Sequence, residues 1–241
     1  MKLMIETGPK GKRVVGIAPD WPGLERGAKN ETELLETLET YLPRYAKVAA
    51  RAGMEGEFLA QEPWQITERY PGPGSTDFWG ISFAPAPHEY SLPSAGEWER
   101  QISLLQAAWA EFDAIAARVS PEMQRGPRGG GRMRDQIISH TYKAEIGEYS
   151  GKLGYKPRLE DLTTPEGLAA HRGTFTSRLR EYHQNGVLKL GRSSWTLPFL
   201  LRHTAYHVLD HAWEMEDKDL TLLQNTASYK RPRCERRPSN R

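Results

Sequence analysis

The stretch TLPFLLRHTAYHVLDHAWE, Thr196 to Glu214, joins a helix start to a row of histidines. Thr196 followed by Leu197-Pro198 is typical of a helix N-cap with proline in the first turn. The residues that follow at a spacing of three or four share one helix face. They are Leu200, His203, His207, His211 and Glu214. The stretch therefore predicts an amphipathic helix whose inner face carries polar side chains.

Three segments upstream show the same helical period. The first carries an apolar stripe from Trp98 to Val119, and the second, from about Met133 to Leu153, turns His140 inward. The third begins at Thr163-Thr164-Pro165-Glu166 and places His171 on its inner face. Four such helices predict an antiparallel four-helix bundle over residues 93–225.

Residues 1–92 have a mixed pattern that predicts a small αβ module. Asn30 followed by Glu33 predicts a capped helix that ends at Gly53, with Pro43 expected to kink or interrupt it. Residues 85–93, rich in proline, are expected to form a linker. Four strands are expected at Lys2–Thr7, Arg13–Ala18, Trp64–Tyr70 and Phe78–Phe83. The predicted fold class is therefore α+β.

Composition and charge exclude several classes of protein. The chain has 241 residues, 38% of them hydrophobic, which excludes disorder throughout. No uncharged apolar run reaches the 18 or so residues of a membrane span, and Met1 to Glu6 is too short for a signal peptide, so a soluble, cytoplasmic protein is expected. The net charge of +2 is the sum of an acidic body and a basic tail, residues 226–241. This tail is expected to be disordered and to bind no specific nucleic acid sequence.

The single cysteine, Cys234, leaves histidine and carboxylate as the residues for any metal site. His203 and His211 are about 12 Å apart along a helix, so the row can offer only one adjacent pair to one ion. A third ligand would come from His140 or His171, between which periodicity does not choose. Such a set leaves a coordination position open. In the alternative interpretation the rings are partly exposed or bonded to bundle carboxylates such as Glu145, Glu148 and Glu214.

The turn Pro19-Asp20-Trp21-Pro22-Gly23-Leu24, with Gly27 before a helix, resembles the HicB-like antitoxin domain. The resemblance covers about a quarter of the chain and implies a small αβ module that contacts a partner. The alternative is that Pro22-Gly23 is only a turn between a strand and a helix.

The stretch from Arg134 through His140 to Tyr149, with Leu153-Gly154, Trp195 and the row Arg202 to Glu214, resembles the DinB/YfiT-like family. That family is a four-helix bundle that holds a divalent metal through one histidine of the second helix and a His-x-x-x-His pair of the last. The resemblance implies His140, His207 and His211 as metal ligands, with His171 and His203 as rivals. Where many members have Arg-Gly-Gln after the last ligand, this chain has Ala212-Trp213-Glu214.

The function expected from this resemblance is that of a metal-dependent hydrolase or a thiol-dependent transferase. Zinc is expected first and nickel second, with a small-molecule substrate and a low-molecular-weight thiol as cosubstrate. Glu145, Tyr206 and Glu214 are candidates for proton transfer or for orienting ligands. Family bundles often dimerise, so the resemblance also suggests a homodimer. The alternative is a binding or regulatory protein in which the metal is structural.

Overall fold

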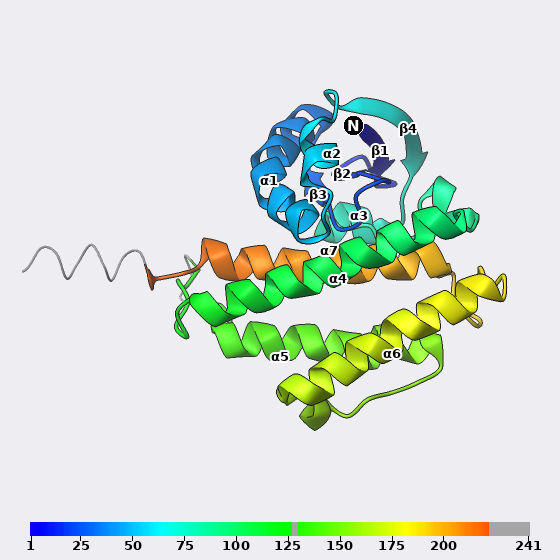
Figure 1. Ribbon diagram of the computed structural model, residues 1–241. Coiled ribbons are helices and arrows are strands. Elements are labelled where there is room, and N and C mark those ends of the chain that lie inside the picture. Colours follow the sequence, from blue (N-terminus) through cyan, green and yellow to red (C-terminus); the bar gives the residue numbers. More distant parts are fainter. Residues whose placement is uncertain (127–129, 222–241) are drawn as a thin grey trace, which may run out of the picture.

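The computed structural model describes residues 1–126 and 130–221, and its fold is mixed α+β. A four-stranded sheet at the N-terminus is followed by long helices that lie side by side (Figure 1). The predicted basic tail at 226–241 lies outside the described residues. None of the described helices is long and apolar enough to span a bilayer.

The sheet has the strand order β3-β2-β1-β4. β1 (Lys2–Thr7) pairs antiparallel with β2 (Val14–Ile17) and parallel with β4 (Gln65–Pro71), which confirms three of the four expected strands. β3 (Glu25–Ala28) pairs antiparallel with β2 and was not expected. Its sequence, ERGA, gives no strand signal because two of its four residues are charged.

The expected helix after Asn30 is α1 (Glu31–Arg51), and the Asn30 side chain accepts a hydrogen bond from the Glu33 backbone N–H at 2.9 Å. Pro43 does not interrupt this helix. Gly53, at φ 72°, follows its end and leads into the short helix α2 (Glu55–Leu59). Leu34 and Leu38 of α1 are buried in the same core as Leu3 of β1, so α1 covers one face of the sheet.

The strand expected at Phe78–Phe83 is wrong. Residues Gly74–Trp79 form the short helix α3, which ends at Gly80 in the left-handed conformation (φ 68°). The apolar run that suggested a strand is exposed, with Phe78 at 70% and Trp79 at 62%.

The segment expected to be a linker, residues 85–93, packs against the second face of the sheet through Ala86. It contains a 3-10 turn, η1 (Pro87–Tyr90), in which Glu89 is buried. Ala86 packs in a small cluster with Met4, Val15 and Ile17.

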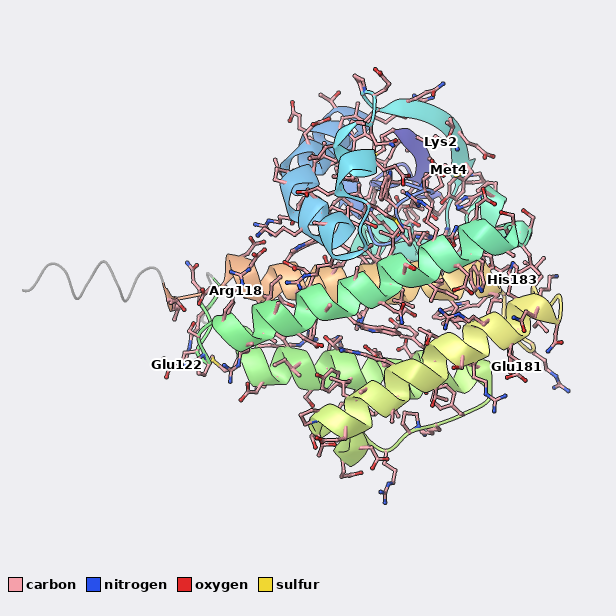
Figure 2. All side chains as sticks on the ribbon, viewed as in Figure 1. Lys2, Met4, Arg118, Glu122, Glu181 and His183 are labelled. Atoms are coloured by element: carbon pink, nitrogen blue, oxygen red, sulfur yellow. The ribbon has the colours of Figure 1, made fainter. Side chains whose placement is uncertain are left out.

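The rest of the described chain is helical, and three of the long helices begin where the sequence predicts. The elements are α4 (Ala95–Arg118), α5 (Arg134–Ala144), the π-helical turn η2 (Glu145–Tyr149), the 3-10 turns η3 (Ser150–Leu153) and η4 (Leu159–Thr163), α6 (Pro165–Gln184) and α7 (Leu197–Asp217). α4 and α5 pack against α7, and α6 packs against α4. Figure 2 shows side chains filling the space between these helices.

The N-terminal part packs directly on α7. Gly23, at φ 93°, lies so close to this helix that a Cβ would be 2.7 Å from Leu209 Cδ1. Arg26 of β3 forms an ion pair with Asp210 (3.0 Å). Arg202 of α7 is buried and forms ion pairs with Glu25 and with Glu89, the latter at 2.7 Å. The Pro22-Gly23 turn is therefore also a packing contact with the helix that carries the histidine row.

Candidate metal centre

Three of the predicted residues come together between α5 and α7. His140 is on α5, and His207 and His211 are one turn apart on α7. One ring nitrogen from each lies within 4.8 Å of the other two. The ring centroids are 4.6 Å apart for His207 and His211, and 4.8 and 5.5 Å for their pairs with His140. The three rings are thus arranged so that one ion could contact all of them.

Glu214 fixes the orientation of His211. The Nδ1–H of His211 donates to Glu214 Oε2 at 2.8 Å, which leaves Nε2 free for a ligand. Lys218 donates to the other carboxylate oxygen. The hydrogen bond from His211 is the main cause that lowers the pKa of Glu214 to about 2. A carboxylate behind a ligating imidazole is a recurring arrangement in metal sites.

The other two rings are held in the form that can bind a metal. Burial lowers the pKa of His207 to about 2 and also lowers the pKa of His140. Both rings are therefore neutral at pH 7, with a lone pair to donate. Nδ1 of His207 is buried and has no hydrogen-bond partner among the described residues. These features fit a borderline metal ion that prefers imidazole nitrogen, such as zinc or nickel.

His203 lies one turn before His207 and is enclosed by aromatic rings. It stacks on Phe199 (5.1 Å between centroids), and Trp195, Phe83 and Tyr149 also contact it. Burial lowers its pKa to about 3, partly offset by a hydrogen bond with the Ser82 backbone. His203 is therefore a neutral, buried ring beside the three-histidine group and not part of it.

His171, the other rival ligand, is paired with Glu145. His171 Nε2 and Glu145 Oε2 are 2.9 Å apart, and both side chains are 1% exposed. The Tyr155 hydroxyl lies 3.2 Å from His171 Nδ1, and the Trp109 indole donates to Glu145 Oε1 at 3.2 Å. The candidate catalytic residue Glu145 is thus bonded to His171 and Trp109.

Tyr206 lies near Glu25, Arg26 and Asp210, whereas Tyr149 contacts the histidine row. Tyr206, a candidate for proton transfer, is 6% exposed, and burial raises its pKa well above its usual range. Tyr149 contacts both His203 and His207, with centroids 5.8 and 5.7 Å apart. Sequence analysis gave Tyr149 no role at the site, because it lies at the end of the π-helical turn, where the helical period breaks.

A cavity of about 810 Å³ lies between α4, α5, η4 and α6. Ile138, Ser139 and Tyr142 line it, and they lie on other faces of α5 than His140. None of the three histidines lines this cavity. The cavity and the histidine group are thus separate features of the helical half.

No protein-family model, curated protein or solved structure matches this chain. The chemistry of the three histidines therefore follows from their own geometry and donor atoms.

Proposed function

We propose that the helical half is a DinB-like four-helix bundle and that His140, His207 and His211 bind one divalent metal ion, with zinc first and nickel second. The observation that carries this proposal is the approach of three imidazole nitrogens, from two helices, to within 4.8 Å of one another. Two of these rings are neutral through burial, and the third is oriented by Glu214. When bound, such an ion lowers the pKa of a coordinated water or thiol and so supplies a nucleophile.

The protein is proposed to use this ion in catalysis, as a metal-dependent hydrolase or a thiol-dependent transferase. Structural zinc is usually enclosed by four protein ligands, whereas the group in the described residues has three. The nearest rivals have other partners: His171 is bonded to Glu145, and His203 is enclosed by aromatic rings. A coordination position thus remains for a substrate or a thiol cosubstrate.

In this proposal the chain's own residues orient and shield the site. Glu214 holds the proton on His211 Nδ1, so Nε2 stays available to the ion. Tyr149 packs against His207 and separates one side of that ring from water. Glu145 has no direct part, because both of its carboxylate oxygens have partners in the helix core.

A second candidate is a regulatory protein with a structural metal and a HicB-like module that binds a partner. It is favoured by β4, which is the last strand of the sheet and is mostly exposed. An exposed strand edge is a common docking site for a partner strand.

Metal analysis of the purified protein tests the metal proposal. We expect one zinc or nickel ion per chain, lost on His207→Ala and retained on His88→Ala, an exposed histidine that serves as the control. Circular dichroism of the same samples shows whether the fold is kept. Unchanged stoichiometry in His207→Ala would refute the site. Loss of metal with the fold retained favours a reaction site over a structural one, and screening with thiol cosubstrates would follow.

A further inference from the structure

The cavity between α4, α5, η4 and α6 is large enough to hold a small molecule. Its volume of about 810 Å³ lies within the range of roughly 300–1,000 Å³ that is typical of ligand pockets. None of the three grouped histidines lines it, so a ligand in this cavity would occupy a second site.

The walls of the cavity are single helix faces joined by η4, which packs against both α5 and α6. The α5 face runs from Asp135 to Tyr142, and the α6 face runs from Pro165 to Arg172. On each helix, the lining residues have the spacing i, i+3, i+4, i+7 of neighbours on one side. The cavity is therefore built from regular helices and not from a long loop.

The interior of the cavity is mostly apolar. Leu162 of η4 is 1% exposed, and Ile138, Leu159 and Leu168, which line the same cavity, are half-buried. Other lining residues, such as Ala169 of α6, are exposed and leave the cavity open to solvent on that side. An apolar molecule that enters would bury its own surface together with that of these side chains.

The wall formed by η4 and the start of α6 is fixed before any ligand binds. A Cβ on Gly167 would lie 1.9 Å from the Asp161 carbonyl oxygen, so the first turn of α6 packs directly on η4. The Gly167 backbone N–H donates to Thr164 Oγ1 at 3.1 Å, and Asp161 forms an ion pair with Arg158 at 3.1 Å. A ligand would therefore not have to order this wall, which favours binding.

The charged side chains that line the cavity are already paired. Both terminal nitrogens of Arg172 donate to Asp113 of α4, at 2.5 and 3.0 Å. Asp135, the remaining charged residue of the lining, forms an ion pair with Arg134 at 2.8 Å. A charged ligand would lose its hydration and find no unpaired counter-ion among the lining residues.

Two hydroxyl groups of the lining are left to bond a ligand. Ser139 and Tyr142 both line the cavity, and neither hydroxyl has a hydrogen bond to another residue in the part of the chain that the structure describes. Burial raises the pKa of Tyr142 to about 12, and the charges of Asp113 and Arg172 also act on it. The phenol is therefore protonated at pH 7 and can donate a hydrogen bond.

We propose that this cavity binds an uncharged, largely apolar small molecule whose hydroxyl or carbonyl oxygen bonds to Ser139 or Tyr142. The apolar interior selects the body of the ligand, the paired charges disfavour an ionised group, and the two hydroxyls select an oxygen. This inference goes beyond the proposed metal function and does not depend on it, because the cavity and the histidine group share no residue.

Three anthracene derivatives test the inference, because they share one flat apolar body and differ in charge. Anthracenemethanol is neutral, anthracenecarboxylate is an anion and anthracenemethylamine is a cation. The anthracene ring absorbs at longer wavelengths than tryptophan, so its fluorescence anisotropy measures binding to the full chain. The alcohol is expected to bind about tenfold or more tightly than either charged compound, because burial of an unpaired charge is costly. Added zinc should leave the affinity for the alcohol unchanged.

A matched pair of variants places the probe in the cavity. Ala169→Trp puts a large side chain into the cavity from an exposed position of α6, and it should weaken binding of the alcohol about tenfold or more, because a filled cavity has no room for the ring system. Ala170→Trp is the control: Ala170 is also exposed but does not line the cavity, so this variant should bind like the wild type.

Two conservative variants test the hydrogen bond. Tyr142→Phe and Ser139→Ala each remove one hydroxyl, and at least one of them should weaken binding of anthracenemethanol severalfold. The same variant should leave the affinity for methylanthracene unchanged, since that compound has no oxygen. Should Ala169→Trp not fold by circular dichroism, this comparison still decides whether the probe lies in the cavity.

Several results would overturn the inference. Equal binding to Ala169→Trp and Ala170→Trp would show that the probe binds elsewhere. Equal or tighter binding of a charged compound would refute an uncharged ligand, and an alcohol that binds only with zinc would belong to the metal centre. Absence of binding by all of the compounds would refute the site. Failure of the metal proposal, by contrast, would leave zinc-independent binding of the alcohol intact.

Discussion

Glu214 is the residue on which the orientation of His211 depends. Glu214→Gln should weaken zinc binding about 10- to 100-fold and leave the fold intact, because the amide is a poorer acceptor for the His211 Nδ1–H. Competition with a chromophoric zinc chelator measures the change. Lys218→Met is the matched control. Lys218 donates to Glu214 but has no hydrogen bond with His211 among the described residues. Equal zinc affinity in the Glu214 variant and the wild type would show that the carboxylate does not support the ligand.

Glu25 gives a second prediction, about pH. Burial raises the pKa of Glu25 from 4.5 to about 7, although the positive charge of Arg202 acts in the opposite direction. The negative charges of Glu6 and Glu89 also raise the pKa of Glu25. The Tyr70 hydroxyl is another titratable group close to it. Because the folded state holds this proton more tightly than the unfolded state, the contribution of Glu25 to stability falls as pH rises from about 4.5 to 7. Relative to the wild type, Glu25→Gln should gain stability between pH 5 and pH 8, by an amount on the order of 1–3 kcal/mol. This gain adds to a cost, independent of pH, of removing one partner of Arg202.

Urea unfolding of both proteins between pH 5 and pH 8, at fixed metal loading, measures this difference. Histidines titrate in both proteins, so their contribution cancels from the comparison. A difference between variant and wild type that stays flat across this pH range would contradict the prediction.

All three grouped histidines were among the candidate ligands, but the helical period alone did not determine which of the candidates share one ion. The helical period predicts that one adjacent pair of the row His203, His207 and His211 can bind an ion, because residues four apart lie one turn apart. The choice of His207 and His211 came from the resemblance to the DinB/YfiT-like family. Whether His140 or His171 joins them depends on how the helices pack, which periodicity does not contain. The partner of His171 is Glu145, the first residue of the π-helical turn, where the register of α5 changes.

Helix starts were the elements that the sequence predicted best. Asn30, Thr164 and Thr196 each cap a helix through the side-chain hydrogen bond that their residue type suggests. Such caps are local, so neighbouring residues suffice to predict them. β3 was missed for the opposite reason: its buried residues Glu25 and Arg26 pair with Arg202 and Asp210, which lie far along the chain.

The cap of α1 can be tested directly. Asn30→Ala should lower the free energy of unfolding by about 1 kcal/mol, because the Glu33 backbone N–H loses its acceptor. Asn30→Ser keeps a capping oxygen and should stay within a few tenths of a kcal/mol of the wild type. Thermal and urea unfolding of the two variants give the comparison. A similar loss in both variants would show that the amide donor to Glu33, at 3.0 Å, and not the cap, carries the effect.

For the molecule as a whole, the change of sequence period predicted where the helical half begins but not how the halves meet. The boundary near residue 92 stays a prediction. Across the line between the halves, however, the buried core is continuous: Leu34 and Tyr45 of α1 belong to the same cluster as Trp213 of α7. Arg26 lies against both Tyr41 and Trp213, 3.8 and 4.5 Å from the ring centroids. Contacts of this kind depend on tertiary packing, so the pattern of neighbouring residues in the sequence does not predict them.

This shared core predicts that the two halves unfold together. Arg202 is central to this shared core, because it forms buried ion pairs with both Glu25 and Glu89 where the two halves meet. Removing one partner of a buried ion pair costs about 3–5 kcal/mol. Hydrogen exchange followed by mass spectrometry in increasing urea should show the slowest amides of β2, α4 and α7 converging on one opening free energy. Arg202→Met should lower that value for all three elements alike, since each loses the same shared core. Exchange of β2 at lower urea, while α4 and α7 stay protected, would show that residues 1–92 unfold as a separate unit.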